Sequence, residues 1–201
     1  MKGNAMGRPK SDEQTAPEKM QEAFWKLLEQ KPYSQITISD VTRTSGLNRS
    51  AFYYHYNNVP ELADDAIASV YEKQGVITLI VRLIRTPDDP EVLKAYDDFI
   101  TRPEYQSTVH KMSLIAGPHG SAGLSRQLKD YIIGAWIPLF GLDKAKLDAS
   151  QQLVLEFASS GILGLFGKAS SLFTTQGIES IKRSTLPETI SHLINSLKNE
   201  E

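Results

Sequence analysis

No cysteine occurs among the 201 residues of this chain. Disulfide frameworks and thiolate metal sites are therefore excluded, and the composition suits the reducing cytoplasm. Long apolar runs are missing as well, since the least polar stretch, 157–167, is much shorter than the roughly 20 residues that a membrane-spanning helix needs. The N-terminal segment lacks the apolar core of a secretory signal. We expect a cytoplasmic protein without a membrane partner.

The common catalytic arrangements are also missing. The four histidines are scattered and form no HExxH pair, and no GxSxG motif is present. The glycine-rich GILGLFG has neither the lysine-serine ending nor the preceding strand of a phosphate-binding loop. We therefore predict no catalytic residue, no metal ligand and no cofactor. An enzyme that uses a pocket between helices stays open as an alternative.

Charge is present but unevenly placed. The whole chain has a net charge of −2, whereas residues 1–56 carry eight lysines and arginines against six acids. The N-terminal part is thus net positive and the remainder net negative. This asymmetry favours an anionic partner for the N-terminal part.

The periodicity of apolar residues predicts an all-α chain, with few of the alternating β-branched runs that indicate strands. From Pro17 to Lys31, apolar residues recur at the spacing of one face of an amphipathic helix. Pro32 ends this first helix, because proline cannot donate the backbone hydrogen bond that would continue it.

The next segment predicts two short capped helices. Thr37 is placed to cap a helix over 38–45, and Gly46 can take the left-handed conformation that ends it. Asn48 then caps a third helix, from 49 to about 56. Two short helices joined by a tight glycine turn describe a helix-turn-helix.

The third helix has two different faces. Phe52 and Tyr56 share a face by i, i+4 spacing and are expected to pack on the first two helices. Arginine and hydroxyl side chains on an exposed helix suit the major groove of DNA. A helical hairpin whose tyrosines merely cover a core remains the alternative. The outward residues are Arg49, Ser50, Tyr53 and Tyr54.

The stretch ITISDVTRTSGLNRSAFYYHYNNVPEL resembles the DNA-binding signature of TetR-type transcriptional regulators, and the likeness covers about residues 20–62. An apolar-threonine pair opens the second helix, a small-glycine-apolar turn follows, and the third helix runs from polar and basic residues to an aromatic and histidine ending. The resemblance implies a long fourth helix and a variable helical domain that binds a ligand and dimerises.

The same resemblance implies roles for individual residues. Thr37 would hold a phosphate at the start of the second helix, and Arg49 and Ser50 would face base edges. The sequence departs from the family at the start of the fourth helix, where NNVP (57–60) replaces a frequent phosphate-binding lysine. That contact is therefore lost or passes to an asparagine amide. The remaining DNA-contacting residues expected here are Asn48, Tyr53, Tyr54 and His55.

The N-terminal GRPK segment is a candidate minor-groove arm, because flexible arginine-bearing arms are used in this way. Arg8 and Lys10 would make its contacts; the alternative is a solvated tail. Either Met1 or Met6 suits a natural start. The expected division of the chain is an arm over 1–14, a DNA-binding domain over 15–60, and an effector-binding and dimerisation domain over 61–201.

The second domain is predicted to be helical over 60–85, 91–101, 104–115, 121–140, 152–173 and 187–198. Its middle helices carry many large apolar side chains, which line an apolar effector cavity or fill one another's space as core. Arg126, Lys129 or His119 would pair with a carboxylate on such an effector. The candidate effector-binding residues are Tyr96, Phe99, Tyr105, Met112, Trp136 and Phe140.

Small residues form a strip at i, i+4, i+7 and i+11 on the helix over 152–173. Such a strip lets another helix come close; the alternative is a helix inside the core. The resemblance favours dimerisation through this helix and the last one. The strip consists of Ser160, Gly164, Gly167 and Ser171.

Together these patterns predict a homodimeric transcriptional regulator, and more specifically a repressor. It would bind a palindromic operator in double-stranded DNA and leave it when a small, mostly apolar effector binds. A DNA-binding regulator or activator controlled by a protein partner is the other interpretation that the sequence leaves open.

Overall fold

The computed structural model describes residues 14–72, 79, 82, 86, 89–168, 176, 180 and 183–197. All regular structure within these residues is helical, which confirms the predicted all-α fold. Besides two short 3-10 turns, Tyr33–Gln35 and Lys144–Lys146, the described helices are α1 (Ala16–Gln30), α2 (Ile38–Ser45), α3 (Arg49–His55), α4 (Val59–Glu72), α6 (Pro90–Ile100), α7 (Pro103–Ala116), α8 (Ala122–Leu139), α9 (Ala149–Phe166) and α12 (Leu186–Asn195).

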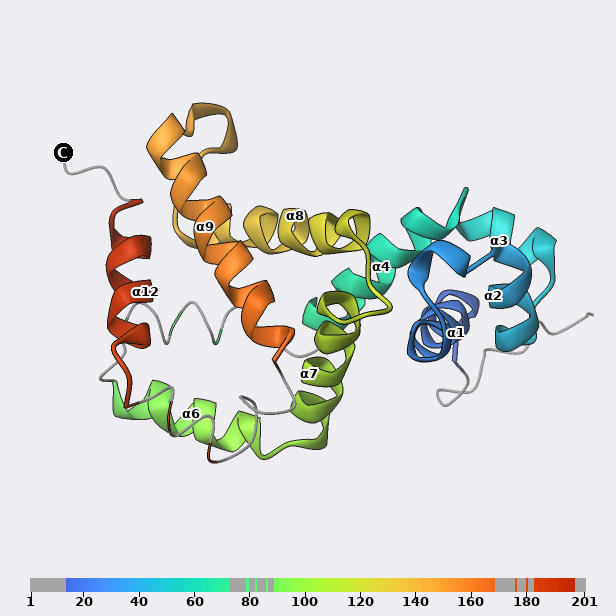
Figure 1. Cartoon of the computed structure of the whole chain (residues 1–201), viewed down its shortest axis with the longest axis horizontal. Coiled ribbons are helices and arrows are strands. Elements are labelled where there is room, and N and C mark those ends of the chain that lie inside the picture. Colours follow the sequence, from blue (N-terminus) through green and yellow to red (C-terminus); the bar gives the residue numbers. More distant parts are fainter. Residues whose placement is uncertain are drawn as a thin grey trace, which may run out of the picture.

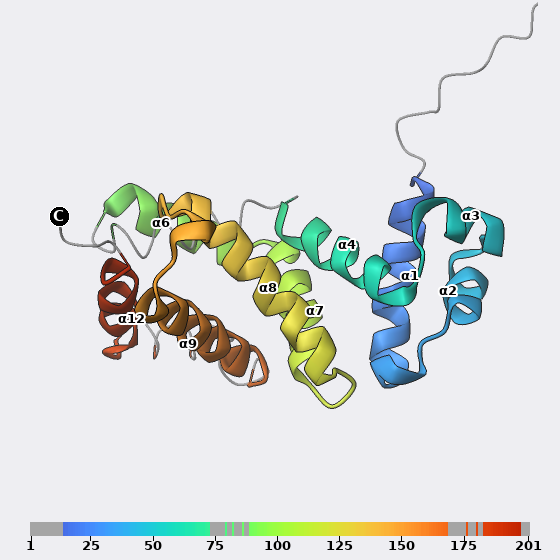
Figure 2. The ribbon, with the colours of Figure 1, turned by 90° about the horizontal axis from the view of Figure 1, so that it is seen from above.

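The helices form two groups along an elongated molecule. Helices α1, α2 and α3 gather at one end, and α4 leads from them to the second group (Figure 1). There α8 packs against both α4 and α9, while α7 contacts α1, α8 and α9. Helices α6 and α12 lie at the far end from α1–α3, as the view from above also shows (Figure 2). The predicted helix-turn-helix thus lies at one tip of the molecule.

Helix α1 begins at a capping box that our sequence analysis missed. The Thr15 hydroxyl accepts a hydrogen bond from the backbone N of Glu18, whose carboxylate accepts one from the backbone N of Thr15 at 3.0 Å. These bonds satisfy two otherwise unpaired N–H groups. The helix therefore starts at Ala16 instead of Pro17, and it ends one residue before the predicted Lys31.

The helix-turn-helix forms with the predicted boundaries. Thr37 and Asp40 make a reciprocal capping box at the start of α2. Gly46 ends α2 with φ of +72°, a left-handed conformation that favours glycine over residues with a Cβ. The Asn48 side chain accepts a hydrogen bond from the Ala51 backbone N at 2.8 Å and so caps α3.

The later helices agree with the sequence to within a few residues at most ends. Only Val59–Glu72 of the predicted 60–85 helix is assigned as helix α4, and most of the remainder lies outside the described residues. Helix α9 starts three residues earlier than predicted, at Ala149, because Asp148 and Gln151 form a capping box. It ends at Phe166, before the predicted end at residue 173.

One apolar core runs through both groups of helices. Phe24 of α1 and Phe52 of α3 are completely buried in the first group, and Met112 of α7 is completely buried in the second. Burying a large apolar side chain contributes about 1.5–3 kcal/mol, so these residues hold the helix-turn-helix on α1. No helix of the described residues is long and apolar enough to cross a lipid bilayer.

Candidate nucleic-acid interface

Helix α3 presents two large aromatic side chains to solvent. Tyr54 is 84% exposed and Tyr53 is 56% exposed, whereas Phe52 beside them is fully buried. Arg49 and Ser50 are exposed as well. The outward placement expected from helical spacing is therefore observed. An exposed helix end with a cation, a hydroxyl and two phenols offers the donors that phosphates and base edges accept.

The Arg49 side chain has a partner that the sequence did not indicate. Its Nη2 atom donates a hydrogen bond to the hydroxyl oxygen of Ser39 on α2, over 3.0 Å. Arg49 is thus held across the two helices of the motif. To contact a base, the guanidinium has to give up this bond or use its other N–H donors.

Thr37 has the exposed position expected of a phosphate contact, but its hydroxyl is already in use. It donates to Asp40 Oδ2 at 2.7 Å and accepts from the Asp40 backbone N at 3.2 Å. The position and the capping role are therefore clear. A contact between Thr37 and phosphate remains a proposal, made either through the remaining lone pair or after the hydroxyl rotates.

Asp40 joins three neighbouring groups. Its carboxylate accepts from Lys31 Nζ and from Arg43 Nη2, each at 2.6 Å, in addition to Thr37. The hydrogen bonds from Lys31 and then Thr37 hold the pKa of Asp40 well below its usual range. The carboxylate is therefore ionised at neutral pH and offsets part of the positive charge around α2. Arg43 stays 74% exposed and can also face phosphate.

The two asparagines that replace the family's lysine are engaged locally. Asn57 donates from its backbone N and its amide Nδ2 to Glu61 Oε2, at 2.8 and 2.9 Å. The Asn58 side-chain oxygen accepts from the Glu61 backbone N at 2.9 Å and caps α4. The arrangement gives α4 a defined start. It provides no cation in place of the missing lysine.

The end of α3 is fixed to α4 and α1 by one carboxylate. Asp65 of α4 accepts hydrogen bonds from the Tyr56 hydroxyl and, at 2.7 Å, from Gln21 Nε2 of α1. Burial, followed by the bond to Asp65, raises the pKa of Tyr56 above its ordinary value. The phenol therefore stays protonated as a donor. His55 lies between the rings of Tyr54 and Tyr56 and is partly buried, which makes it the least accessible of the predicted DNA contacts on α3.

The turn between α7 and α8 closes onto the group formed by α1, α2 and α3, here called the DNA-binding group after its predicted role. The Nδ1 atom of His119 lies 2.8 Å from the Leu28 carbonyl oxygen, and the Tyr33 backbone N donates to the His119 carbonyl at 2.7 Å. Because a carbonyl only accepts, His119 Nδ1 carries the proton. Leu28 is in the last turn of α1, where carbonyl groups lack partners within the helix. His119 thus caps α1 from the other group of helices.

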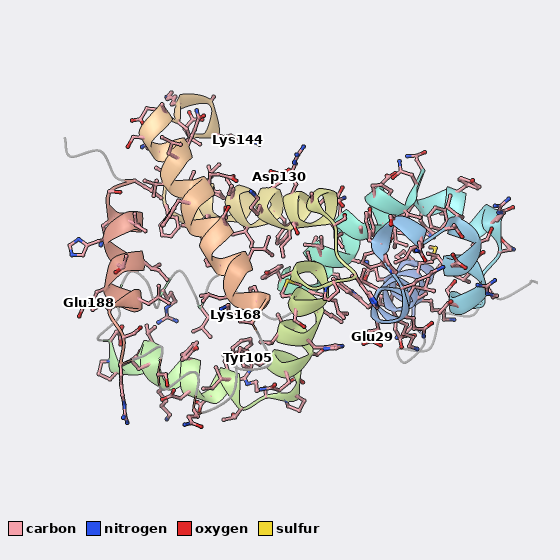
Figure 3. All side chains as sticks on the ribbon, viewed as in Figure 1. Glu29, Tyr105, Asp130, Lys144, Lys168 and Glu188 are labelled. Atoms are coloured by element: carbon pink, nitrogen blue, oxygen red, sulfur yellow. The ribbon has the colours of Figure 1, made fainter. Side chains whose placement is uncertain are left out.

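Two further contacts join α7 to α1. His110 Nε2 lies 2.8 Å from a carboxylate oxygen of Glu29, and the ammonium of Lys111 lies 5.7 Å from the centre of the Trp25 ring. Figure 3 shows Glu29 at the border between the two groups of helices. The orientation of α1 is therefore coupled to α7 at several points. Sequence analysis missed them, because the partners are 81 and 86 residues apart.

The predicted effector residues lie in the second group of helices. Tyr96 is partly buried and the other five are buried. Two grooves on the described part of the chain are elsewhere: one of about 650 Å³ lies between α3, α4 and α8, and one of about 690 Å³ lies between α8 and α9. Arg126 and Lys129 line the second of these grooves, but His119 lines neither. The assignment of the six residues to an effector site stays a prediction.

The described residues of the predicted dimer strip lie on an exposed side of α9, where they border its groove with α8. Ser160, Gly164 and Gly167 are exposed. On the same helix Leu153 is 70% and Phe157 is 67% exposed, and 153, 157, 160 and 164 share one face by spacing. Exposed large apolar residues in a row are typical of an interaction surface. The use of this face for dimerisation stays a prediction.

Three predicted contact residues cannot be placed. Arg8 and Lys10 of the arm, and Ser171 of the dimer strip, lie outside the described residues. Among the described residues, no group of three or more histidines and carboxylates is arranged to hold a metal ion.

Comparison with known proteins gives two similarities. No family model matches the chain. Over 51 residues, which are 25% of this chain and 13% of the relative, the sequence is 47% identical to the uncharacterized HTH-type transcriptional regulator YxbF of Bacillus subtilis (strain 168). The TetR family repressor AlkX from Dietzia sp. strain DQ12-45-1b, implicated in biodegradation of n-alkanes, matches 92% of this chain and 99% of its own. That structural match has 20% identity and a TM-score of 0.42. One of the two matched proteins is thus described as an HTH-type transcriptional regulator and the other as a TetR family repressor, in line with the resemblance noted in the sequence.

Proposed function

We propose that the chain is a TetR-type transcriptional regulator that binds double-stranded DNA with α2 and α3 and represses transcription from its site. The observation that carries the proposal is the exposed face of α3, with Arg49 beside the turn and Tyr53 and Tyr54 open to solvent. Both similar proteins are regulators by name, and neither name is that of an enzyme. We propose that it does so in the cytoplasm.

We assign α3 to the major groove. Arg49 then contacts a guanine edge and Ser50 a neighbouring base, while the Tyr53 and Tyr54 hydroxyls meet phosphates. Thr37 and Asn48 lie at the helix starts, where the first backbone N–H groups have no partner within the helix and can bind phosphate. His55 faces the groove wall. Arg8 and Lys10 would extend the contacts into the minor groove.

The functional unit in this proposal is a homodimer. Its interface is the outer face of α9, where the small side chains of Ser160 and Gly164 allow close approach and Leu153 and Phe157 supply apolar area. A two-fold axis gives two copies of α3 and hence a palindromic operator. Successive major grooves on one side of DNA are about 34–36 Å apart, so the spacing of the two helices decides whether the dimer binds.

A small, mostly apolar effector controls this spacing in the proposed mechanism. It binds among the aromatic residues of α6, α7 and α8 and favours a dimer whose α3 helices have a different spacing. The His119 cap on α1 and the His110–Glu29 contact carry a movement of α7 to the DNA-binding group. A ligand shifts such an equilibrium only by its difference in affinity for the two states.

Selection of bound fragments from random-sequence DNA tests the proposal. We expect a palindromic site, and a Kd that weakens steeply with salt because phosphates are contacted. Recovery of no preferred sequence, together with binding that is insensitive to salt, contradicts DNA recognition by this chain. Once the site is known, linkage requires that operator DNA and an effector weaken each other's binding by the same factor.

A further inference from the structure

Two buried side-chain polar atoms in the described part of the chain have no hydrogen-bond partner, the hydroxyl oxygens of Tyr33 and Tyr105. Tyr33 is only partly buried and lies at the edge of the DNA-binding group, against Phe24. Tyr105 is 7% exposed and belongs to the second group of helices. Buried polar atoms are bonded in the large majority of cases, so the Tyr105 hydroxyl needs an explanation.

The position of Tyr105 is well defined by its neighbours. It lies in the first turn of α7, where its backbone N donates to the Arg102 carbonyl at 3.1 Å. The Phe99 ring of α6 meets it edge to face, with the ring centres 5.4 Å apart. Figure 3 shows the side chain on the inner side of the corner between α6 and α7, the side that faces α9. The phenol is therefore held in place inside the domain.

The chemistry of this hydroxyl is that of a neutral donor. Burial, with a smaller effect from nearby Tyr96, raises the pKa of Tyr105 above its ordinary value. The O–H group consequently keeps its proton at physiological pH. A neutral phenol offers one donor hydrogen and two acceptor lone pairs, and here all of them are unused.

We propose that the Tyr105 hydroxyl is the polar anchor of the effector site, and that the effector is a neutral, largely apolar molecule with one hydrogen-bond-accepting oxygen. The inference rests on the proposed function, in which an effector binds in this domain. The aromatic rings of Tyr96 and Phe99 match an apolar body. Moving a charged carboxylate from water to a place among these rings costs far more than moving an uncharged polar group, so an uncharged ketone, ester or alcohol fits this hydroxyl better than a carboxylate does.

A pair of probes that differ by one oxygen tests the anchor. Acetophenone has the ring and chain of ethylbenzene with a carbonyl in place of a methylene group. Both are titrated into the full-length protein by calorimetry, without DNA, and into the Tyr105→Phe variant. We expect the Kd of acetophenone, divided by the Kd of ethylbenzene, to be about five-fold higher in the variant than in the wild type. A factor of this size is the usual effect of losing one hydrogen bond.

The same variant is informative without any ligand. Removing an unpaired buried hydroxyl leaves a better-satisfied core, so Tyr105→Phe should keep or raise the thermal midpoint. Tyr56→Phe is the matched control, because that hydroxyl is bonded to Asp65 and its loss should lower the midpoint. A Tyr105→Phe variant that loses as much stability as Tyr56→Phe overturns the proposal, since the hydroxyl would then be structural.

The remaining outcomes are also decisive. Wild-type protein that binds neither probe at millimolar concentration overturns the inference, and so does an unchanged ratio in Tyr105→Phe. DNA binding is measured separately without probes, and the variant should bind DNA like wild type. If the wild-type protein does not bind DNA at all, the proposed function is refuted instead. The dependence of probe binding on Tyr105 then stands as a separate result.

Discussion

Arg49 is the side chain whose role in sequence recognition is easiest to test. A bidentate contact of arginine with guanine contributes about 1–3 kcal/mol of discrimination, so Arg49→Ala should weaken the specific complex by that amount and relax the preference at one base pair. Quantitative DNA-binding titrations on the selected site and on its single-base variants measure both effects.

Ser39→Ala is the matched control for this experiment. It frees the Arg49 guanidinium without removing it, because the hydroxyl is its hydrogen-bond partner in the unbound chain. Its affinity for DNA should be kept or increased, with the base preference intact. An Arg49→Ala variant with unchanged affinity and unchanged preference would exclude Arg49 as a base-reading residue.

Asp40 contributes to stability through charge. Its pKa is lowered in the folded protein, so its contribution is present at neutral pH and is lost as the pH falls below the ordinary range of an aspartate, about 4. Asp40→Ala should lower the free energy of unfolding by about 1–2 kcal/mol, because it removes half of a capping box and the bonds to Lys31 and Arg43.

Urea denaturation at several pH values measures this effect. The difference between wild type and Asp40→Ala should shrink in acid, where the wild-type carboxyl is protonated too. Glu22→Ala serves as a control, because Glu22 makes an exposed i, i+4 pair with Lys26 that is worth only a few tenths of a kcal/mol. If both variants lose the same free energy of unfolding at every pH, the contacts of Asp40 do not stabilise the fold in the way described.

The short connections between elements were the most predictable part of the fold. Thr37, Gly46 and Asn48 each act on backbone groups within a few residues, so the local sequence is enough to predict their effect. The capping box of Thr15 was not predicted, although a threonine three residues before a glutamate is the expected pattern for one. Contacts such as Arg49–Ser39 depend on how α2 and α3 pack, and spacing along the chain does not determine that.

The turn between α7 and α8 joins the two groups of helices through backbone contacts. A Cβ on Gly120 would lie 1.8 Å from the Ile115 carbonyl oxygen, so the turn closes only with glycine there. That tight closure places His119 on the end of α1. Sequence analysis treated His119 as a partner for an effector carboxylate. Its bond spans 91 residues of chain, a separation at which no local pattern is informative.

We expect His119→Ala to loosen the last turn of α1. Hydrogen exchange followed by mass spectrometry should become faster over residues 28–36, and the free energy of unfolding should fall by about 1 kcal/mol. His192→Ala on α12 is the control, because that histidine is exposed. Exchange that is identical in wild type and His119→Ala would show that the α7–α8 turn does not hold α1.

At the scale of the whole molecule, the outer face of α9 predicts assembly. Gly164→Leu should prevent close approach of a second copy, because a large side chain cannot be accommodated in a contact made by small residues. The variant is expected to sediment as a monomer and to bind the palindromic site poorly, with its helical circular dichroism retained.

Gly134→Leu on α8 is the matched control for assembly. It is also an exposed helical glycine whose added Cβ would meet nothing within 4 Å, but it lies off the α9 face. It should remain a dimer. If Gly164→Leu dimerises with undiminished affinity, the α9 face is not the interface.

The division of the chain into an arm, a DNA-binding domain and an effector domain remains a prediction at this scale. The boundaries of the first three helices were predicted to within about one residue, because capping residues and a family signature occur together in that segment. It was less informative about the second domain, where aromatic residues at helical spacing fit a core and a cavity equally well. Only the packing of α6 against α7 singles out Tyr105 among them.

The hydrogen bond between Arg49 and Ser39 also has a kinetic consequence. A protein that searches a chromosome spends most of its time on other sequences, held there by attraction to phosphates. On such sequences Arg49 keeps its bond to Ser39, because a base without two acceptors on its edge gives nothing better in exchange. In the proposed mechanism, the dimer would therefore slide past wrong sites with Arg49 bound to α2, and a guanine at the right position would release the side chain. The hydrogen bond between Arg49 and Ser39 would thus weaken binding at the operator and also shorten the time that the protein spends on other sequences before it reaches the operator.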